Sequence, residues 1–255
     1  MIDSHCHLDL DAFNDDRAQI IQQAISCGVS RIHIPGTEAY RWKELLSLAE
    51  SAFIDISLGL HPYFLANYQV DSLNAQLQSL EGLLDSHTSQ VFAVGECGLD
   101  AVIDVDFGLQ TEIFKRHIQL ASTFSKPLIV HARKSHHHII QCLKQCRFEG
   151  GGIIHAFNGS AEVAEQYTQR GWKLGIGGTI TYPRGQKTRQ TLIKVGLEHL
   201  VLETDSPDMP LFGFQGRRNV PARLPQIASV LAETLSVSVQ EVVETTSENY
   251  LSLAQ

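Results

Sequence analysis

The sequence predicts an α/β protein built as a single (β/α)8 TIM barrel over residues 1–255. Three observations support this fold class. The chain has 255 residues, which is the usual size of one such barrel. Short apolar runs alternate with longer segments of helical spacing, as in a parallel sheet with crossover helices. No linker, low-complexity tract or block of like charge divides the chain.

Eight apolar runs rich in Val, Ile and Leu are the expected strands. The first lies near Ile2, and the others lie at residues 31–34, 54–58, 91–94, 128–130, 153–154, 173–176 and 200–202. An open doubly wound sheet is the alternative arrangement. It has less support, because no GxGxxG motif follows the first run.

Apolar residues at helical spacing separate the expected strands. These patterns lie around residues 20–25, 45–49, 73–84, 114–121 and 139–143. Two further helical patterns follow Pro221 and Val239, which predicts one helix beyond the eighth repeat.

The composition excludes several classes of protein. With 43% hydrophobic and 19% charged residues the chain is globular, and it has no run of 18 apolar residues that could cross a membrane. The start of the sequence has no basic segment before an apolar stretch, and the five cysteines form no CxxC pair, so we expect a cytoplasmic protein with free thiols. The net charge of -8 argues against a general nucleic-acid footprint, so any such contact must be local. Nothing indicates an obligate protein partner.

In a parallel barrel the functional side chains stand at the C-terminal ends of the strands. Six of the eight expected strands are followed there by a residue of metal-ligand type. These residues are His5 and His7, His61, Glu96, His131, His155 and Asp205.

The spacing of these residues indicates how they could act. Side chains two residues apart on a strand point to the same side, so His5 and His7 could bind one metal, although such a pair alone could equally satisfy core hydrogen bonds. Glu96 is costly to bury unless a cation pairs with it, and a carboxylate can bridge two metals. Four imidazoles and two carboxylates suit two divalent cations, namely Zn, Mn or Mg.

Six motifs occur in the order found in a known family. They are DSHCHLD at residues 3–9, GLHP at 59–62, GECGLD at 95–100, HAR at 131–133, HAFNGS at 155–160 and ETDSP at 203–207. Together they resemble the TatD family of metal-dependent deoxyribonucleases and related hydrolases, and residues 177–183 and 208–216 look most like its YjjV-type branch.

The resemblance implies a two-metal site at the mouth of a (β/α)8 barrel. It implies that His5, His7 and Asp205 hold one ion, that His131 and His155 hold the other, and that Glu96 bridges them. Asn158 and the Ala101-Val102 pair differ from the residues common in the family. These differences bear on the expected substrate more than on the expected metal ligands.

Several other polar residues have both a functional and a structural interpretation. His61 could contact substrate or cap a loop, and Arg133 could bind a phosphate oxygen or form an ion pair at the rim. Asp100 could hold a water or cap the next turn. The run His136-His137-His138 is expected to be a solvated helix start, because consecutive helical side chains diverge. Basic loop residues could guide an anionic substrate but are usually only solvated; they are Lys187, Arg189, Arg217 and Arg218.

The predicted activity is hydrolysis of phosphate esters by a metal-activated water. The family resemblance favours a deoxyribonuclease. A barrel mouth admits a frayed end more readily than a duplex, so we expect trimming of single-stranded DNA, with Asp205 as the catalytic proton acceptor and His61 and Arg133 as substrate contacts. A small-molecule hydrolase acting on a lactone, cyclic amide or phosphomonoester could use the same site. A non-catalytic metal- or nucleotide-binding module is disfavoured, because it would not need Asp205.

Overall fold

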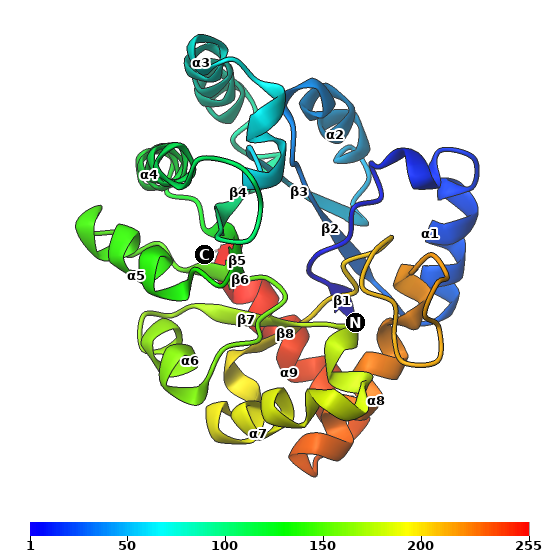
Figure 1. The fold of residues 1–255 in the computed structure, drawn as a ribbon. Coiled ribbons are helices and arrows are strands. Elements are labelled where there is room, and N and C mark those ends of the chain that lie inside the picture. The colour runs from blue at the N-terminus through cyan, green and yellow to red at the C-terminus, as the bar shows by residue number, and fades with distance from the viewer. Residues whose placement is uncertain (255) are drawn as a thin grey trace. The chain divides into compact units, whose positions relative to one another are not determined.

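The computed structural model describes residues 1–254, apart from the side chains of Val70 and Asp71. Eight strands alternate with helices along this part of the chain, and the pairings within each unit are parallel (Figure 1). Contacts group the chain into two compact units. Unit 1 comprises Met1–Ile34 and His155–Gln255, and unit 2 comprises Pro35–Ile154.

Unit 1 contains the first and last strands of the chain. Its strands are β1 (Ile2–Asp3), most of β2 (Arg31–Pro35), β7 (Lys173–Ile176) and β8 (Leu200–Leu202). Its helices are α1 (Arg17–Ser26), α6 (Ala161–Thr168), α7 (Gln186–Val195), α8 (Leu224–Leu235) and α9 (Val239–Leu251). Ile2 pairs with Arg31, Leu174 pairs with Leu200, and Ser4 N donates to Leu202 O at 2.9 Å.

Unit 2 contains the longest strands. Its strands are β3 (Ile54–Leu58), β4 (Val91–Asp100), β5 (Leu128–Arg133) and β6 (Gly152–Ile154), of which β4 and β5 are the longest. The helices of this unit are α2 (Trp42–Leu48), α3 (Val70–Ser86), α4 (Phe107–Thr123) and α5 (His136–Gln145). The β4 and β5 strands stay paired from Val94 with Leu128 to Asp100 with Arg133, with one irregularity between Val94 and Cys97.

The eight predicted strands are confirmed, but two of them extend three or more residues beyond the prediction. The pairing of β4 with β5 continues beyond the apolar runs, so Glu96 and His131 lie inside strands and not after them. The prediction stopped early because Gly-Glu-Cys-Gly has no apolar pattern, although backbone hydrogen bonding does not require one.

The helix predictions were incomplete. All five helical patterns before β6 are confirmed, and α9 is the predicted helix beyond the eighth repeat. The sequence analysis did not predict α6 or α7. Helix α6 has only 8 residues, and α7 is mostly polar, with Thr191 and Leu192 as its buried residues.

Two glycines allow β4 and β5 to approach closely. Gly95 and Gly98 both have φ +139, and a Cβ atom would lie 2.4 Å from Ile129 O at Gly95 and 2.1 Å from His131 O at Gly98. No other residue fits such a position without moving the neighbouring strand.

The described residues bear on the predicted absence of a membrane-spanning segment and on the predicted free thiols. Within residues 1–254 no helix combines the length and the apolar character needed to span a membrane. All five cysteines are free thiols, as predicted. That the chain is one domain stays a prediction.

Candidate metal centre

Two histidines of unit 2 converge on one carboxylate oxygen of Glu96. The Oε1 atom of Glu96 lies 3.3 Å from His61 Nε2 and 3.4 Å from His131 Nδ1. Glu96 is buried on β4, His131 stands on β5, and His61 precedes the short helix at Pro62–Asn67. We call these three residues the β4/β5 ligand set.

The backbone and two neighbouring side chains orient this set. The strand register places His131 opposite Gly98, and Glu96 N donates to Gly36 O at 2.8 Å. His131 Nε2 lies 3.1 Å from Asp100 Oδ2, which leaves Nδ1 toward Glu96. Inside α4, His117 accepts a hydrogen bond from Leu60 N at 3.0 Å and thereby fixes the backbone next to His61.

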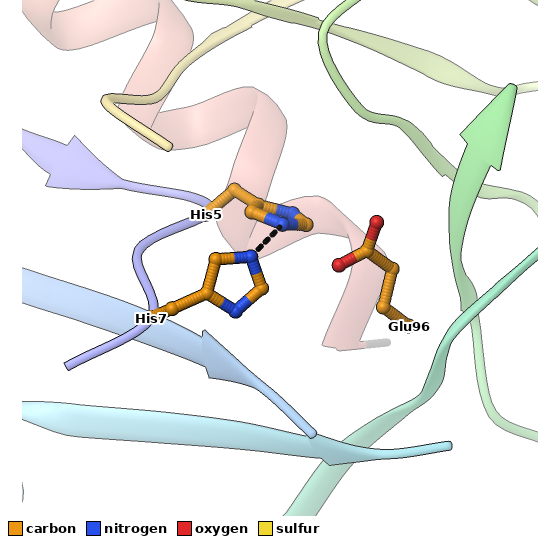
Figure 2. A group of neighbouring side chains, drawn as sticks. All are labelled: His5, His7 and Glu96. Atoms are coloured by element: carbon orange, nitrogen blue, oxygen red, sulfur yellow. Dashed lines mark hydrogen bonds between the residues drawn. The ribbon is translucent and has the colours of Figure 1, made fainter. Parts of the chain in front are cut away.

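Four ligand-type side chains converge in unit 1. The Nε2 atoms of His5 and His7 are 3.2 Å apart, the contact marked by the dashed line in Figure 2. Asp205 Oδ1 lies 3.8 Å from His5 Nε2 and 3.4 Å from His7 Nε2, and Asp205 Oδ2 lies 4.0 Å from His155 Nε2. The His5 and His155 rings stack with centroids 3.7 Å apart. We call His5, His7, His155 and Asp205 the HxH ligand set.

Two buried carboxylates hold the HxH ligand set in place. Asp3 accepts hydrogen bonds from Thr204 N at 2.9 Å and Thr204 Oγ1 at 2.7 Å, which joins the end of β1 to the segment after β8. Glu203 Oε1 lies 3.2 Å from His155 Nδ1 and accepts from Ala156 N at 2.7 Å. With Nδ1 occupied in this way, His155 presents Nε2 toward Asp205.

The charge state of Asp205 suits cation binding. Burial alone would raise the pKa of Asp205, but the neighbouring His155, His7 and His5 outweigh it and lower this pKa to about 2. The carboxylate is therefore ionised at neutral pH. Burial raises the pKa of Glu203, with His155 opposing that shift. Burial opposes ionisation of Asp100 as well, but His131 and the Val102 amide prevail, so its pKa is lowered.

The spacing of the donor atoms fits a divalent cation. Tetrahedral ligands about 2.0–2.1 Å from zinc stand roughly 3.3 Å from one another. The contacts made by Glu96 and by His7 span 3.2–3.4 Å. Imidazole nitrogen and carboxylate oxygen are also the donors preferred by zinc and manganese. The structure thus contains candidate metal-binding groups in both units, among them His61, Glu96 and His131, and His5, His155 and Glu203.

Comparison with known proteins identifies the family. The family model described as TatD related DNase matches residues 2–255. The chain belongs to the TatD family. It is 38% identical to the uncharacterized metal-dependent hydrolase YjjV of Escherichia coli over 99% of this chain and 96% of that protein. It is also 30% identical to the uncharacterized metal-dependent hydrolase YabD of Bacillus subtilis, over 98% and 96% of the two chains.

Solved structures confirm the fold class. The crystal structure of YjjV from Escherichia coli, described as a TatD homologue, matches with a TM-score of 0.93 over 100% of this chain and 97% of the other. The TatD-family hydrolase of Entamoeba histolytica matches with a TM-score of 0.86 at 21% identity, over 100% and 97% of the two chains, which shows the fold alone. The chain is therefore a metal-dependent hydrolase of the TatD family with the (β/α)8 fold.

The predicted site residues can now be compared with their positions. Within unit 1 the structure brings together His5, His7, His155 and Asp205, and within unit 2 it brings together His61, Glu96 and His131. The side chain of Arg133 is 58% exposed and lies 3.9 Å from Asp100 Oδ2, the ion pair weighed as its structural interpretation. The role of each residue as ligand or substrate contact stays a prediction.

No role was predicted for the carboxyl groups of Asp3 and Glu203, and only part of the role of Asp100 was predicted. Glu203 was quoted within a motif but given no role, because its contact with His155 joins residues far apart in the chain. The predicted capping by Asp100 is confirmed, since its Oδ1 accepts from Val102 N at 2.9 Å. Its contact with His131 was not predicted. A carboxylate beside each candidate ligand histidine is the signal that could have found both.

Proposed function

We propose that this TatD-family protein is a phosphodiesterase that removes nucleotides from single-stranded DNA ends. One observation carries the proposal: histidine and carboxylate donors converge at ligand spacing in a chain that matches the TatD related DNase model from residue 2 to 255. Hydrolysis of a phosphodiester by a two-metal site needs these donors together with a carboxylate near the attacking water.

The proposed site uses both ligand sets. In a (β/α)8 fold the C-terminal ends of all strands open onto one mouth, which favours a single centre. In this proposal His5, His7 and Asp205 would hold one cation, and His131 and His155 would hold the other, with Glu96 as a ligand of both. Glu203 and Asp100 fix the ring nitrogens that His155 and His131 present.

Two divalent cations of Zn, Mn or Mg would bind a phosphate oxygen and lower the pKa of the attacking water. The protein side chains supply the remaining steps. The ionised carboxylate of Asp205 orients that water and accepts its proton. His61, beside Glu96, and Arg133, at the exposed end of β5, hold the phosphate of the substrate.

Asp205→Asn tests the catalytic assignment. The amide still coordinates weakly but cannot accept a proton, so we expect hydrolysis to fall by about 10²-fold or more with most metal binding retained. Glu96→Gln is the matched control, since it should weaken metal occupancy as well as rate. Turnover of an oligonucleotide by Asp205→Asn within a few-fold of wild type would remove Asp205 from the catalytic step.

A small-molecule hydrolase is the second candidate function, and the net charge of -8 favours it. An acidic surface repels a DNA chain, whereas a lactone, cyclic amide or small phosphate ester meets little of that surface. A panel of single-stranded DNA, duplex DNA, phosphomonoesters and lactones, each with Mg, Mn and Zn, separates the two functions. Turnover of a small substrate without cleavage of DNA would replace the nuclease proposal.

The cellular setting belongs to the same proposal. Five free thiols, three of them buried, fit a reducing compartment, and we assign the protein to the cytoplasm. Fractionation of cells that express the tagged chain tests this assignment.

A further inference from the structure

Two exposed tyrosines lie in unit 2, on the segments that follow β2 and β3. Tyr40, in the segment after β2, is 66% exposed, and Tyr63, after β3, is 60% exposed. The other four tyrosines of the described chain are buried or half-buried. An exposed tyrosine ring combines an apolar face with a polar hydroxyl, which suits it to contacts with a ligand.

A series of ring contacts leads from the ligand set to Tyr63. The His131 and His61 rings are 4.5 Å apart, and the His61 and Phe64 rings are 5.9 Å apart. Phe64 in turn meets Tyr63 at 5.1 Å with an interplanar angle of 85°. All three contacts are edge-to-face, the geometry that aromatic pairs prefer. The Tyr63 ring is therefore positioned relative to the residues that surround Glu96.

The segment that carries Tyr40 is hydrogen-bonded to the segment that carries His61 and Tyr63. His61 N donates to Thr37 O at 3.0 Å, and Ala39 N donates to Tyr68 Oη at 3.1 Å. The guanidinium of Arg41 lies over the Tyr40 ring, 4.9 Å from its centroid. Arg41 itself is buried, so it supports one face of the ring while the ring remains largely exposed.

The negative net charge makes base stacking a more effective way to bind a polynucleotide than ion pairs with its phosphates. The net charge is -8, and two of the basic residues considered as guides are already engaged, of which Arg189 lies on α7 and not in a loop as expected. Arg189 donates to Ile180 O and to Tyr182 O, and Arg218 is paired with Asp16. Both guanidinium groups would have to give up these contacts to bind a phosphate. Stacking of a base on an aromatic ring needs no positive charge and contributes about 1–3 kcal/mol per base.

We infer that Tyr40 and Tyr63 are base-stacking contacts for the nucleotides next to the scissile phosphate of a single-stranded polynucleotide. This inference rests on the proposed function and names the form of its substrate. A duplex offers no free base faces except at a frayed end, so the two rings select single strands. They act in binding and not in the chemical step.

The test compares alanine with phenylalanine at both positions. Each Tyr→Ala change should raise KM for an oligothymidylate by about 5- to 150-fold, the equivalent of one lost stack, with kcat nearly unchanged. Tyr40→Phe and Tyr63→Phe keep the ring and should behave as wild type. Ile25→Ala, which trims an exposed apolar side chain of α1, is the control for general surface effects.

A substrate without bases serves as the control for effects on the hydrolytic site itself. KM for bis(4-nitrophenyl) phosphate should change much less than KM for the oligonucleotide in the alanine variants, because the short diester does not extend along the strand. An unchanged KM for the oligonucleotide in Tyr40→Ala, Tyr63→Ala and the double variant would overturn the inference.

Binding separates this inference from the proposed function. If the wild type cleaves no oligonucleotide with any metal, the nuclease proposal fails, and fluorescence anisotropy of the same labelled oligonucleotide then decides the stacking inference. Binding by the wild type that is lost in the double alanine variant supports the two contacts. Absence of binding, or equal binding by both proteins, overturns them.

Discussion

The two ligand sets are held in different ways. In unit 2, Glu96 and His131 stand on β4 and β5, strands of 10 and 6 residues whose pairing continues past both side chains. In unit 1, β1 has 2 residues and β8 has 3, so His5, His7 and Asp205 lie on segments beyond the strands.

Buried side chains replace the strand pairing in unit 1. Asp3 joins the segments after β1 and β8 through Thr204, and Asn219 Nδ2 donates to Thr204 O at 2.8 Å. Glu203 orients His155 in the same way. In unit 2 the backbone fixes the direction of each ligand and Asp100 refines it, whereas in unit 1 hydrogen bonds from side chains do most of this work.

The largest predicted effect comes from disturbing the β4/β5 pairing. Gly98→Ala places a Cβ atom 2.1 Å from His131 O at φ +139. We expect this strain and crowding to lower the free energy of unfolding by about 4 kcal/mol, as measured by urea denaturation. Gly82→Ala in α3 is the control. Its Cβ atom meets nothing within 4 Å, so the helix should gain roughly 0.5–1 kcal/mol.

The second prediction concerns acid and the loop that carries His61. Burial lowers the pKa of His117 to about 4 from its ordinary 6.5. Between these values the unfolded chain binds a proton that the folded chain does not, so stability falls as the pH drops from 6.5 to 4. The expected loss is about 3 kcal/mol.

His117→Gln tests this assignment, because an amide can replace both hydrogen bonds of the ring but does not titrate. The difference in unfolding free energy between pH 7 and pH 4 should shrink by that amount in the variant. An identical pH profile in the two proteins would contradict the role of His117.

The third prediction compares the two orienting carboxylates. Glu203→Gln should weaken Mn or Zn binding by about 10- to 100-fold, because His155 loses the partner that fixes its ring. Asp100→Asn should cost about 10-fold or less, because β5 still directs His131. Isothermal titration of both variants measures the two affinities. An equal or larger loss in Asp100→Asn would mean that the strands do not orient His131.

The smallest predicted effect tests the hydrogen bonds that join β1 to β8. Thr204→Val keeps the side-chain shape but removes the 2.7 Å bond to Asp3 and the two bonds that Thr204 Oγ1 accepts from Ser206, and should cost about 1–2 kcal/mol of stability. Thr234→Val removes an ordinary bond within α8, from Thr234 Oγ1 to Val230 O, and should cost about 0.5 kcal/mol or less. Thermal unfolding of the two variants measures the difference, and equal shifts would show that Thr204 has no special role.

The fold class and the ligand types could be predicted from sequence because both depend on local patterns. An apolar run indicates a strand from local sequence alone, and eight such runs leave few alternatives. Six of these runs are followed by His, Glu or Asp, although Glu96 and His131 lie inside their strands and not after them. The lengths of strands that depend on pairing with a neighbouring strand were predicted less well. The extension of β4 to Asp100 follows from its pairing with β5, and the polar helix α7 gave no apolar stripe to find.

The sequence by itself determined which residues could serve as metal ligands and the order of strands that presents them. Only the tertiary structure decided how the rings are oriented: His131 presents Nδ1 because Asp100 contacts Nε2, and His155 presents Nε2 because Glu203 contacts Nδ1. Each choice depends on a carboxylate from another part of the chain. Hydrogen bonds of this kind require atoms within about 3 Å, a distance that sequence spacing does not encode.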